Sequence, residues 1–136
     1  MTSYKNQFTV NQPKTKVFEQ MSDLRNIEKH KDKFPNNTDL EMQFAQDFIS
    51  AKLPVLGEAI VRLVEKKGEE NLKFSVENLP MTANVYIKLD EIETEKTQIQ
   101  IVLEVDIPFF LGKIIGDKLQ NALDKTAEII AETLNQ

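Results

Sequence analysis

Hydrophobic and polar residues alternate along most of this chain. The alternation begins over residues 3–11 and returns from 39 to 108 in about six segments, which short turns such as 54–57 and 66–70 separate. In the clearest segment, every second position from Ile99 to Ile107 is isoleucine, leucine or valine. Successive side chains of a strand point to opposite faces, so this pattern predicts antiparallel strands with one buried and one solvated face.

Two stretches have a helical period instead. After Pro13, apolar residues recur at helical spacing with one polar interruption, which predicts two short helices over about 13–21 and 23–31. The second stretch covers about 109–134 and has a broad apolar side opposite a charged side. It predicts one long amphipathic helix.

The order of these elements narrows the fold class. A helix with one apolar side and a sheet with one apolar face can each bury that surface against the other. The sequence therefore predicts an α+β protein in which about seven strands form a curved antiparallel sheet wrapped around the long C-terminal helix, with two short helices after the first strand. No linker or internal repeat interrupts this order, so we expect a single domain over 1–136.

Composition excludes several kinds of chemistry. The 136 residues include no cysteine and one histidine, His30, so the chain has no thiol nucleophile, no zinc-thiolate site and no site that needs two histidines. We therefore expect no metal and no cofactor. His30 lies between lysines, as in a solvated surface patch, and no phosphate-binding loop or nucleophile motif occurs. We predict no catalytic residue.

Charge and hydropathy bear on partners and location. The formal net charge of −5 argues against a nucleic-acid partner. No apolar run approaches the roughly 20 residues that span a bilayer, so no integral membrane association is expected. The polar first residues lack the apolar stretch of a secretory signal, and we expect a cytoplasmic protein, as a monomer or weak homodimer.

A pair of glycines falls on the apolar side of the long helix. Gly112 and Gly116 each cost the helix about 0.5–1 kcal/mol relative to alanine, so their presence needs a reason. One reason is the close approach of a strand to the helix. The other is an unfilled space between the helix and the sheet.

Unfilled space would form an apolar pocket, the common form of a small-ligand site. The dry face of the sheet would line this pocket, the start of the long helix would close it, and apolar loop residues would border its mouth. The residues that we predict to contact a ligand are Phe8, Phe34, Phe44, Leu53, Phe74, Met81, Val85, Ile87, Ile101, Leu103, Phe110, Gly112, Ile114 and Gly116.

Four local patterns follow one another along the chain. They are the strand that runs into a proline and a helix over 10–23, the Pro-Val-Leu-Gly turn at 54–57, the alternating strand over 97–108, and the closing helix with Gly112 and Leu119. Taken in this order, they resemble the START-like, or SRPBCC, superfamily, most closely its short bacterial members. The superfamily includes polyketide cyclase/dehydrase-like and lipid-transport proteins with the helix-grip fold. The resemblance implies a deep cavity between the sheet and the N-terminal half of the last helix.

Three functions stay open at this point. The first is binding or transport of a small hydrophobic molecule, lipid-, isoprenoid- or polyketide-like, in the internal cavity. The second is a polyketide cyclase/dehydrase-like enzyme, for which Tyr4, Asn6 and Asn78 are the polar candidates inside the pocket. The third is a protein-interaction module that uses apolar residues of the nominally wet faces: Ile60, Val64, Tyr86 and Val102.

Overall fold

The computed structural model describes residues 2–33, 41–53, 57–78, 81–107 and 109–135 and, for 29–33, 53, 57 and 109–115, only their backbone. Within these residues, seven strands form one antiparallel sheet in the order β1-β7-β6-β5-β4-β3-β2. The strands are β1 (Thr2–Val10), β2 (Met42–Phe44), β3 (Phe48–Leu53), β4 (Gly57–Lys67), β5 (Asn71–Glu77), β6 (Ala83–Glu93) and β7 (Lys96–Val105). The helices are α1 (Lys14–Met21), the 3₁₀ helix η1 (Leu24–Lys33) and α2 (Phe109–Leu134).

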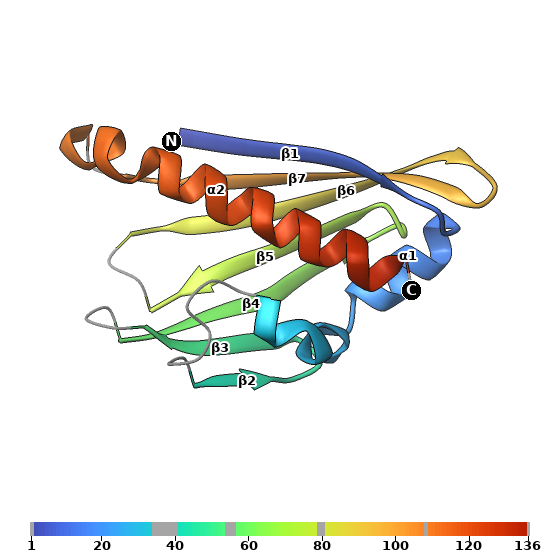
Figure 1. Cartoon of the computed structure of the whole chain (residues 1–136), viewed down its shortest axis with the longest axis horizontal. Helices are drawn as coiled ribbons and strands as arrows, with labels where there is room; N and C mark the ends of the chain where they lie inside the picture. Colours follow the sequence, from blue (N-terminus) through green and yellow to red (C-terminus); the bar gives the residue numbers. More distant parts are fainter. Residues whose placement is uncertain (1, 34–40, 54–56, 79–80, 108, 136) are drawn as a thin grey trace.

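All the helices lie on one side of the sheet. Figure 1 shows α2 crossing this side at a slant, with α1 beside its C-terminal end. α2 contacts β1 and η1, and η1 also contacts β2, so the helices together reach from one edge strand to the other. This arrangement is the predicted α+β, helix-grip fold.

The elements agree with the predicted ranges. The long helix is confirmed over Phe109–Leu134, and the first short helix over Lys14–Met21. The second short helix is confirmed in place, but it is a 3₁₀ helix over Leu24–Lys33. The polar interruption at Ser22 and Asp23 separates the two. The Ser22 hydroxyl donates to the Phe18 carbonyl at the end of α1, and the Asp23 carboxylate accepts from the Arg25 amide at the start of η1.

The strand register places the apolar alternation on the face under the helices. Phe74 of β5 pairs with Val85 of β6, which pairs in turn with Leu103 of β7. Directly opposed residues of neighbouring strands point to the same face, so these side chains form one continuous apolar row. The predicted dry face of the sheet is confirmed.

The core is most completely buried where α2 ends and α1 begins. Val10, Val17, Leu89, Ile99 and Leu134 come from different elements, and they belong to one cluster whose members are almost without exposed surface. Van der Waals packing closes the molecule at this end. Part of this cluster, including Leu134, also borders the space that remains between the sheet and α2.

Candidate ligand-binding cavity

A cavity of about 340 Å³ lies between the sheet, α2 and the α1–η1 segment. The sheet supplies an almost entirely apolar wall from β2 to β7, and the helices supply apolar residues with a few polar ones. Asn26 and Ala122 line the cavity and are also exposed, so it reaches the surface between η1 and α2. The described lining residues are Gln20, Met21, Asp23, Leu24, Asn26, Ile27, Met42, Ile49, Ala51, Ala59, Val61, Phe74, Val85, Ile87, Ile101, Leu103, Leu119, Ala122, Leu123, Thr126, Ile130, Thr133 and Leu134.

Small side chains open the middle of the sheet wall. Ala51 of β3 is paired directly with Ala59 of β4, so two neighbouring positions of the buried face carry only a methyl group each. On α2, Ala122 faces the same space. Where larger residues would fill the gap between sheet and helix, these alanines leave volume.

The structure brings part of the predicted site together. Phe74, Val85, Ile87, Ile101 and Leu103, all from β5, β6 and β7, lie on the cavity wall. Their position on the buried face followed from the alternating pattern. Whether they contact a ligand stays a prediction.

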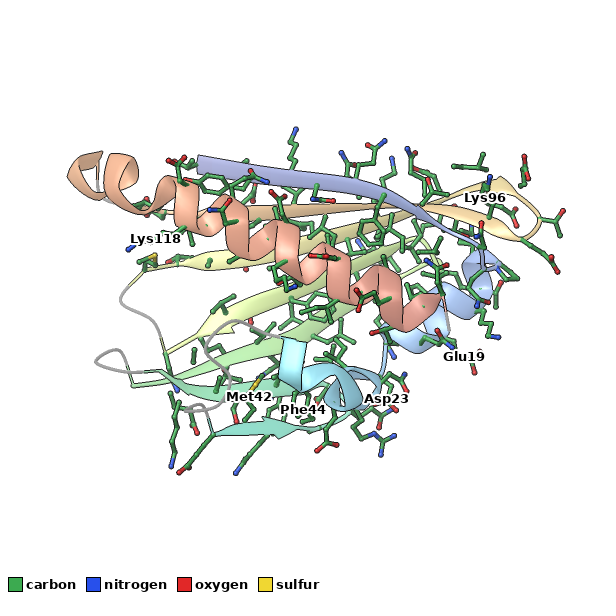
Figure 2. The ribbon with its side chains drawn as sticks, viewed as in Figure 1. Glu19, Asp23, Met42, Phe44, Lys96 and Lys118 are labelled. Carbon is green, nitrogen blue, oxygen red and sulfur yellow. The ribbon has the colours of Figure 1, made fainter. Side chains whose placement is uncertain are left out.

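Other predicted residues lie elsewhere. Phe8 packs against the closed core cluster, because β1 lies under α2 at the sheet edge. Phe44 shares the buried face with its partner Ile49, yet Met42 is the β2 residue that lines the cavity. Figure 2 labels Met42 and Phe44 on β2, at the edge of the sheet. Met81 is half-buried in the turn before β6.

The remaining predicted positions are not tested. Phe34 lies outside the described residues, as do the side chains of Leu53, Phe110 and Ile114 and the surroundings of Gly112.

Gly116 is explained by close packing. A Cβ atom at this position would lie 3.2 Å from the Tyr4 hydroxyl oxygen, which is tighter than ordinary van der Waals contact. The tyrosine comes from β1, the strand that contacts α2. Of the two reasons for a glycine here, the close approach of a strand is the one that the structure supports at Gly116, and this glycine does not line the cavity.

On α2, the described part of the cavity wall runs from Leu119 to Leu134. The side chains of 109–115 lie outside the described residues, so a cavity beside the N-terminal half of the helix stays a prediction. Beside Gly116, the Tyr4 hydroxyl of β1 takes up the nearby space. Beyond that point, Ala122 and Thr126 stand on the inner side of the helix and leave room.

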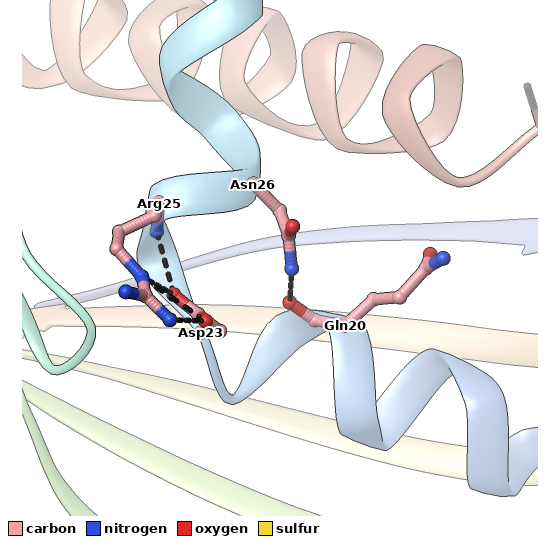
Figure 3. A network of polar contacts seen from close by, with 4 residues as sticks. All are labelled: Gln20, Asp23, Arg25 and Asn26. Atoms are coloured by element: carbon pink, nitrogen blue, oxygen red, sulfur yellow. Dashed lines mark hydrogen bonds and ion pairs between the residues drawn. The ribbon is translucent and has the colours of Figure 1, made fainter.

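Polar residues of the α1–η1 junction form one part of the wall. The Asn26 side-chain amide donates to the backbone carbonyl oxygen of Gln20 at 2.9 Å, and this hydrogen bond joins the end of α1 to η1. Arg25 donates its backbone and guanidinium N–H groups to the Asp23 carboxylate. Figure 3 shows this network, with the Gln20 side chain extending away from it.

Asp23 is the charged residue of the described wall. The side-chain hydrogen bonds from Arg25 hold the pKa of this carboxyl below its ordinary value, and Asp23 in turn raises the pKa of the Arg25 guanidinium. The carboxyl is therefore ionised at neutral pH.

The polar part of the wall was not predicted from the sequence. Gln20, Asp23 and Asn26 lie at the ends of two short helices, where polar residues are expected whatever the function. Thr126 could have been predicted as a polar residue of the wall, because this threonine interrupts a row of leucines and isoleucines on the apolar side of α2.

The candidate catalytic groups are not in the cavity. The Asn6 side-chain amide donates to the Asp124 carboxylate on α2 at 2.8 Å, and Tyr4 lies next to Gly116. Asn78 is exposed and has a backbone φ of 68°. None of the three lies among the described lining residues, so the polar groups on which the enzyme hypothesis depended do not converge.

The outer face of the sheet has separate apolar positions. Tyr86 pairs with Val102 across β6 and β7, and the Lys73 ammonium lies 5.5 Å from the centre of the Tyr86 ring. Val64 is half-exposed at a register shift of β4, and Ile60 comes earlier on the same strand. Tyr86 and Val102 border one hollow, of which Ile60 and Val64 are not part.

The described residues contain no group of three or more histidine, cysteine, aspartate and glutamate side chains that could hold a metal ion. Among the same residues, no helix has the length and apolarity that a membrane-spanning segment needs.

Comparison with known proteins identifies the fold. No protein-family model matches the sequence, and no curated protein matches it either. Among solved structures, a norcoclaurine synthase point mutant from Thalictrum flavum is similar with a TM-score of 0.74 and 12% identity, over 98% of this chain and 93% of that one. A conserved protein from Geobacillus kaustophilus matches with a TM-score of 0.67 and 16% identity, over 98% and 95% of the two chains. A START superfamily protein from Mycobacterium smegmatis matches with a TM-score of 0.60 and 12% identity, over 97% and 93%.

These likenesses cover nearly the whole chain, and they agree with the order of strands and helices. The chain has the START-like, or SRPBCC, helix-grip fold. At such low identity the likeness defines the fold and leaves the function to be argued from the cavity.

Proposed function

We propose that this protein binds a small hydrophobic molecule, of lipid-, isoprenoid- or polyketide-like size and polarity, in the cavity between the sheet and α2. The observation that carries the proposal is the cavity itself. Its volume of about 340 Å³ falls at the lower end of the range for small-molecule sites, and its wall is mostly apolar.

The apolar wall favours a cavity that is filled by a ligand over a cavity that stays empty. Burying apolar ligand surface is favourable by about 25 cal/mol per Å². An empty apolar cavity, in contrast, costs stability because its lining atoms lack partners on one side. A bound apolar molecule would recover those contacts.

The fold comparison gives independent support. Norcoclaurine synthase from Thalictrum flavum, with a TM-score of 0.72 to this chain, has been solved in complex with dopamine and hydroxybenzaldehyde. A protein of this fold thus holds small aromatic molecules. We propose the same kind of cargo here, without the chemical step.

Titration with the environment-sensitive dye prodan tests the proposal. Prodan is neutral, apolar and of naphthalene size, and its emission shifts to the blue in an apolar site. We expect saturable binding with a blue shift. An absence of any saturable signal, combined with no ligand retained in native mass spectrometry of gently purified protein, would overturn the proposal.

A matched pair of variants shows whether the dye enters this cavity. Ala59→Phe places a ring in the space that the alanine leaves open, and we expect the prodan affinity to fall about tenfold or more. Val64→Phe adds the same ring on the same strand, at a half-exposed position away from the cavity, and should leave binding unchanged. Equal binding by both variants would place the dye elsewhere.

The proposal extends to the setting of the protein. We propose a cytoplasmic carrier that is a monomer or weak homodimer and has no nucleic-acid partner, in keeping with the net charge of −5 and the absence of cysteine. Sedimentation at increasing concentration measures the oligomeric state.

A further inference from the structure

We infer that two copies of this chain associate through the outer face of the β6–β7 hairpin, the face that points away from the helices. The copies lie antiparallel, so that Lys88 of each copy meets Asp90 of the other and Ile92 of each copy covers the hollow beside Tyr86 of the other. This surface lies on the opposite side of the sheet from the cavity, so the inference does not depend on the proposed function.

The alternation along β6 defines this outer face. Ile87 and Leu89 are buried under the helices, and Tyr86, Lys88 and Asp90 alternate with them, so these three side chains point to the other face. The pairing of β5 with β6 ends at Lys88. Figure 1 shows the β6–β7 hairpin reaching beyond the ends of the neighbouring strands, where another molecule can approach it.

One row of paired residues on this face has an apolar centre between two lysines. Tyr86 is paired with Val102 of β7, and their outer partners are Lys73 on β5 and Lys5 on β1. Tyr86 and Val102 border a hollow of about 250 Å³, which Lys73 and Lys88 also line. A hollow with this border is complementary to an apolar side chain that has acidic neighbours.

The tip of the same hairpin carries such a side chain. Ile92 is half-exposed and lies at the register shift next to the tip. Glu91, Glu93 and Glu95 are its neighbours in the sequence, and all three are exposed. The tip therefore matches the hollow in both apolarity and charge.

The charges of this face are available to a partner. Within the ranges that the structure describes, Lys5, Lys73, Lys88 and Asp90 form no ion pair. The Lys73 ammonium contacts the Tyr86 ring instead. Ion pairs between two molecules would thus form here without breaking any within one molecule.

The positions of the hollow and the tip on one strand favour a second copy as the partner. Lys88 and Asp90 flank Leu89, and Tyr86 and Ile92 lie equally far from it on either side. A two-fold axis that passes at Leu89 brings each residue before it opposite the residue equally far after it in the other copy. Lys88 then meets Asp90, Tyr86 meets Ile92, and each contact occurs twice.

The expected dimer is weak. Only one face of one hairpin overlaps, and interfaces that bury less than about 1,200 Å² in total are typical of transient complexes. The crossed contacts between Lys88 and Asp90 are exposed in each single copy, so salt screens them. We therefore expect a dimer that forms at high protein concentration and weakens as the salt concentration rises.

Sedimentation velocity at protein concentrations up to the millimolar range measures this association. Lys88→Glu and Asp90→Lys should each raise the dissociation constant of the dimer about tenfold or more, because each variant sets like charges against each other twice. Lys16→Glu makes the same change of net charge as Lys88→Glu, at an exposed position of α1 on the helix side of the sheet. This control should dimerise like the wild type.

An equal mixture of Lys88→Glu and Asp90→Lys distinguishes a two-fold dimer from other modes of binding. In the mixed dimer, both contacts between positions 88 and 90 again join opposite charges. The mixture should therefore associate about as strongly as the wild type, although neither variant does so alone. A face that serves a different protein would not show this recovery.

A second pair of variants tests the apolar contact. Ile92→Ser removes the side chain that covers the hollow and should weaken the dimer about tenfold. Val64→Ser makes a similar change at the other half-exposed apolar position of the described residues, outside the interface, and should leave the dimer unchanged.

Three results would overturn the inference: a wild type that stays monomeric at millimolar concentration, equal association of Lys88→Glu and Lys16→Glu, or a mixture that does not recover. If a charge variant fails to fold, the wild type and the pair Ile92→Ser and Val64→Ser still decide. Prodan binding should be the same in all these variants, because none of the changed residues is among the described lining residues of the cavity. A wild type that dimerises but binds no prodan would contradict the proposed function alone.

Discussion

At the scale of single residues, two small residues of α2 have different surroundings. A Cβ atom at Gly116 would lie 3.2 Å from the Tyr4 hydroxyl oxygen of β1, the strand that contacts α2. Further along the helix, Ala122 has the open cavity before it. A glycine in a helix is compatible with empty space and with close packing, and only the identity of the opposing side chain distinguishes the two.

A double-mutant cycle measures this contact. Gly116→Ala improves helix propensity by about 1 kcal/mol, but in the wild type the new methyl group meets the Tyr4 oxygen, and we expect a net change in unfolding free energy within about 0.5 kcal/mol of zero. In a Tyr4→Phe background the obstacle is gone, and the alanine should stabilise the protein by about 0.5–1 kcal/mol. Urea denaturation gives all four values. Identical effects in both backgrounds would show that Tyr4 is not what requires the glycine.

At the scale of elements, β7 passes through two different environments. Ile99 is fully buried in the closed core cluster, whereas Leu103, on the same face of the same strand, lines the cavity. α2 shows a similar division, since it contacts β1 on one side and borders the cavity from Leu119 onward. A single strand and a single helix thus serve both the core and the candidate site.

Truncation of the two β7 residues should reveal this difference. Ile99→Ala leaves a new void in a close-packed region and should cost about 4 kcal/mol of unfolding free energy. Leu103→Ala only enlarges an existing space and removes fewer contacts, so we expect a cost of about 2 kcal/mol. Chemical denaturation measures both. A cost for Leu103→Ala equal to that of Ile99→Ala would mean that the cavity is filled in solution without added ligand.

At the scale of the whole molecule, the sheet and α2 hold the cavity open between a closed end and a surface opening. The long-range pairing of β1 with β7 joins the first strand of the chain to the last one, from Thr2 opposite Val105 to Val10 opposite Thr97. Because the cavity exists only in the folded state, ligand binding and folding are linked.

This linkage gives a prediction for the intact protein. A ligand at about one hundred times its dissociation constant should add about 2.7 kcal/mol to the stability of the folded state. We expect prodan to raise the melting temperature of the wild type and of Val64→Phe, and to have little effect on Ala59→Phe. Differential scanning calorimetry tests this. An equal rise in all three proteins would indicate binding outside the cavity.

The sequence by itself determined the elements, their order and the face that each one buries. Alternation over β4 to β7 and the helical period over α2 are local patterns, because each strand or helix must turn its apolar side inward whatever its neighbours are. The residues of β5, β6 and β7 on the cavity wall followed from that pattern, as Phe74 and Leu103 show.

Only the tertiary structure decided where the interior is full and where it is empty. The space beside Gly116 is taken by Tyr4, a residue more than one hundred positions earlier in the chain, and the open volume arises where Ala51, Ala59 and Ala122 come together from three elements. A void depends on the combined volumes of side chains from distant segments, and no local period along the sequence encodes that sum.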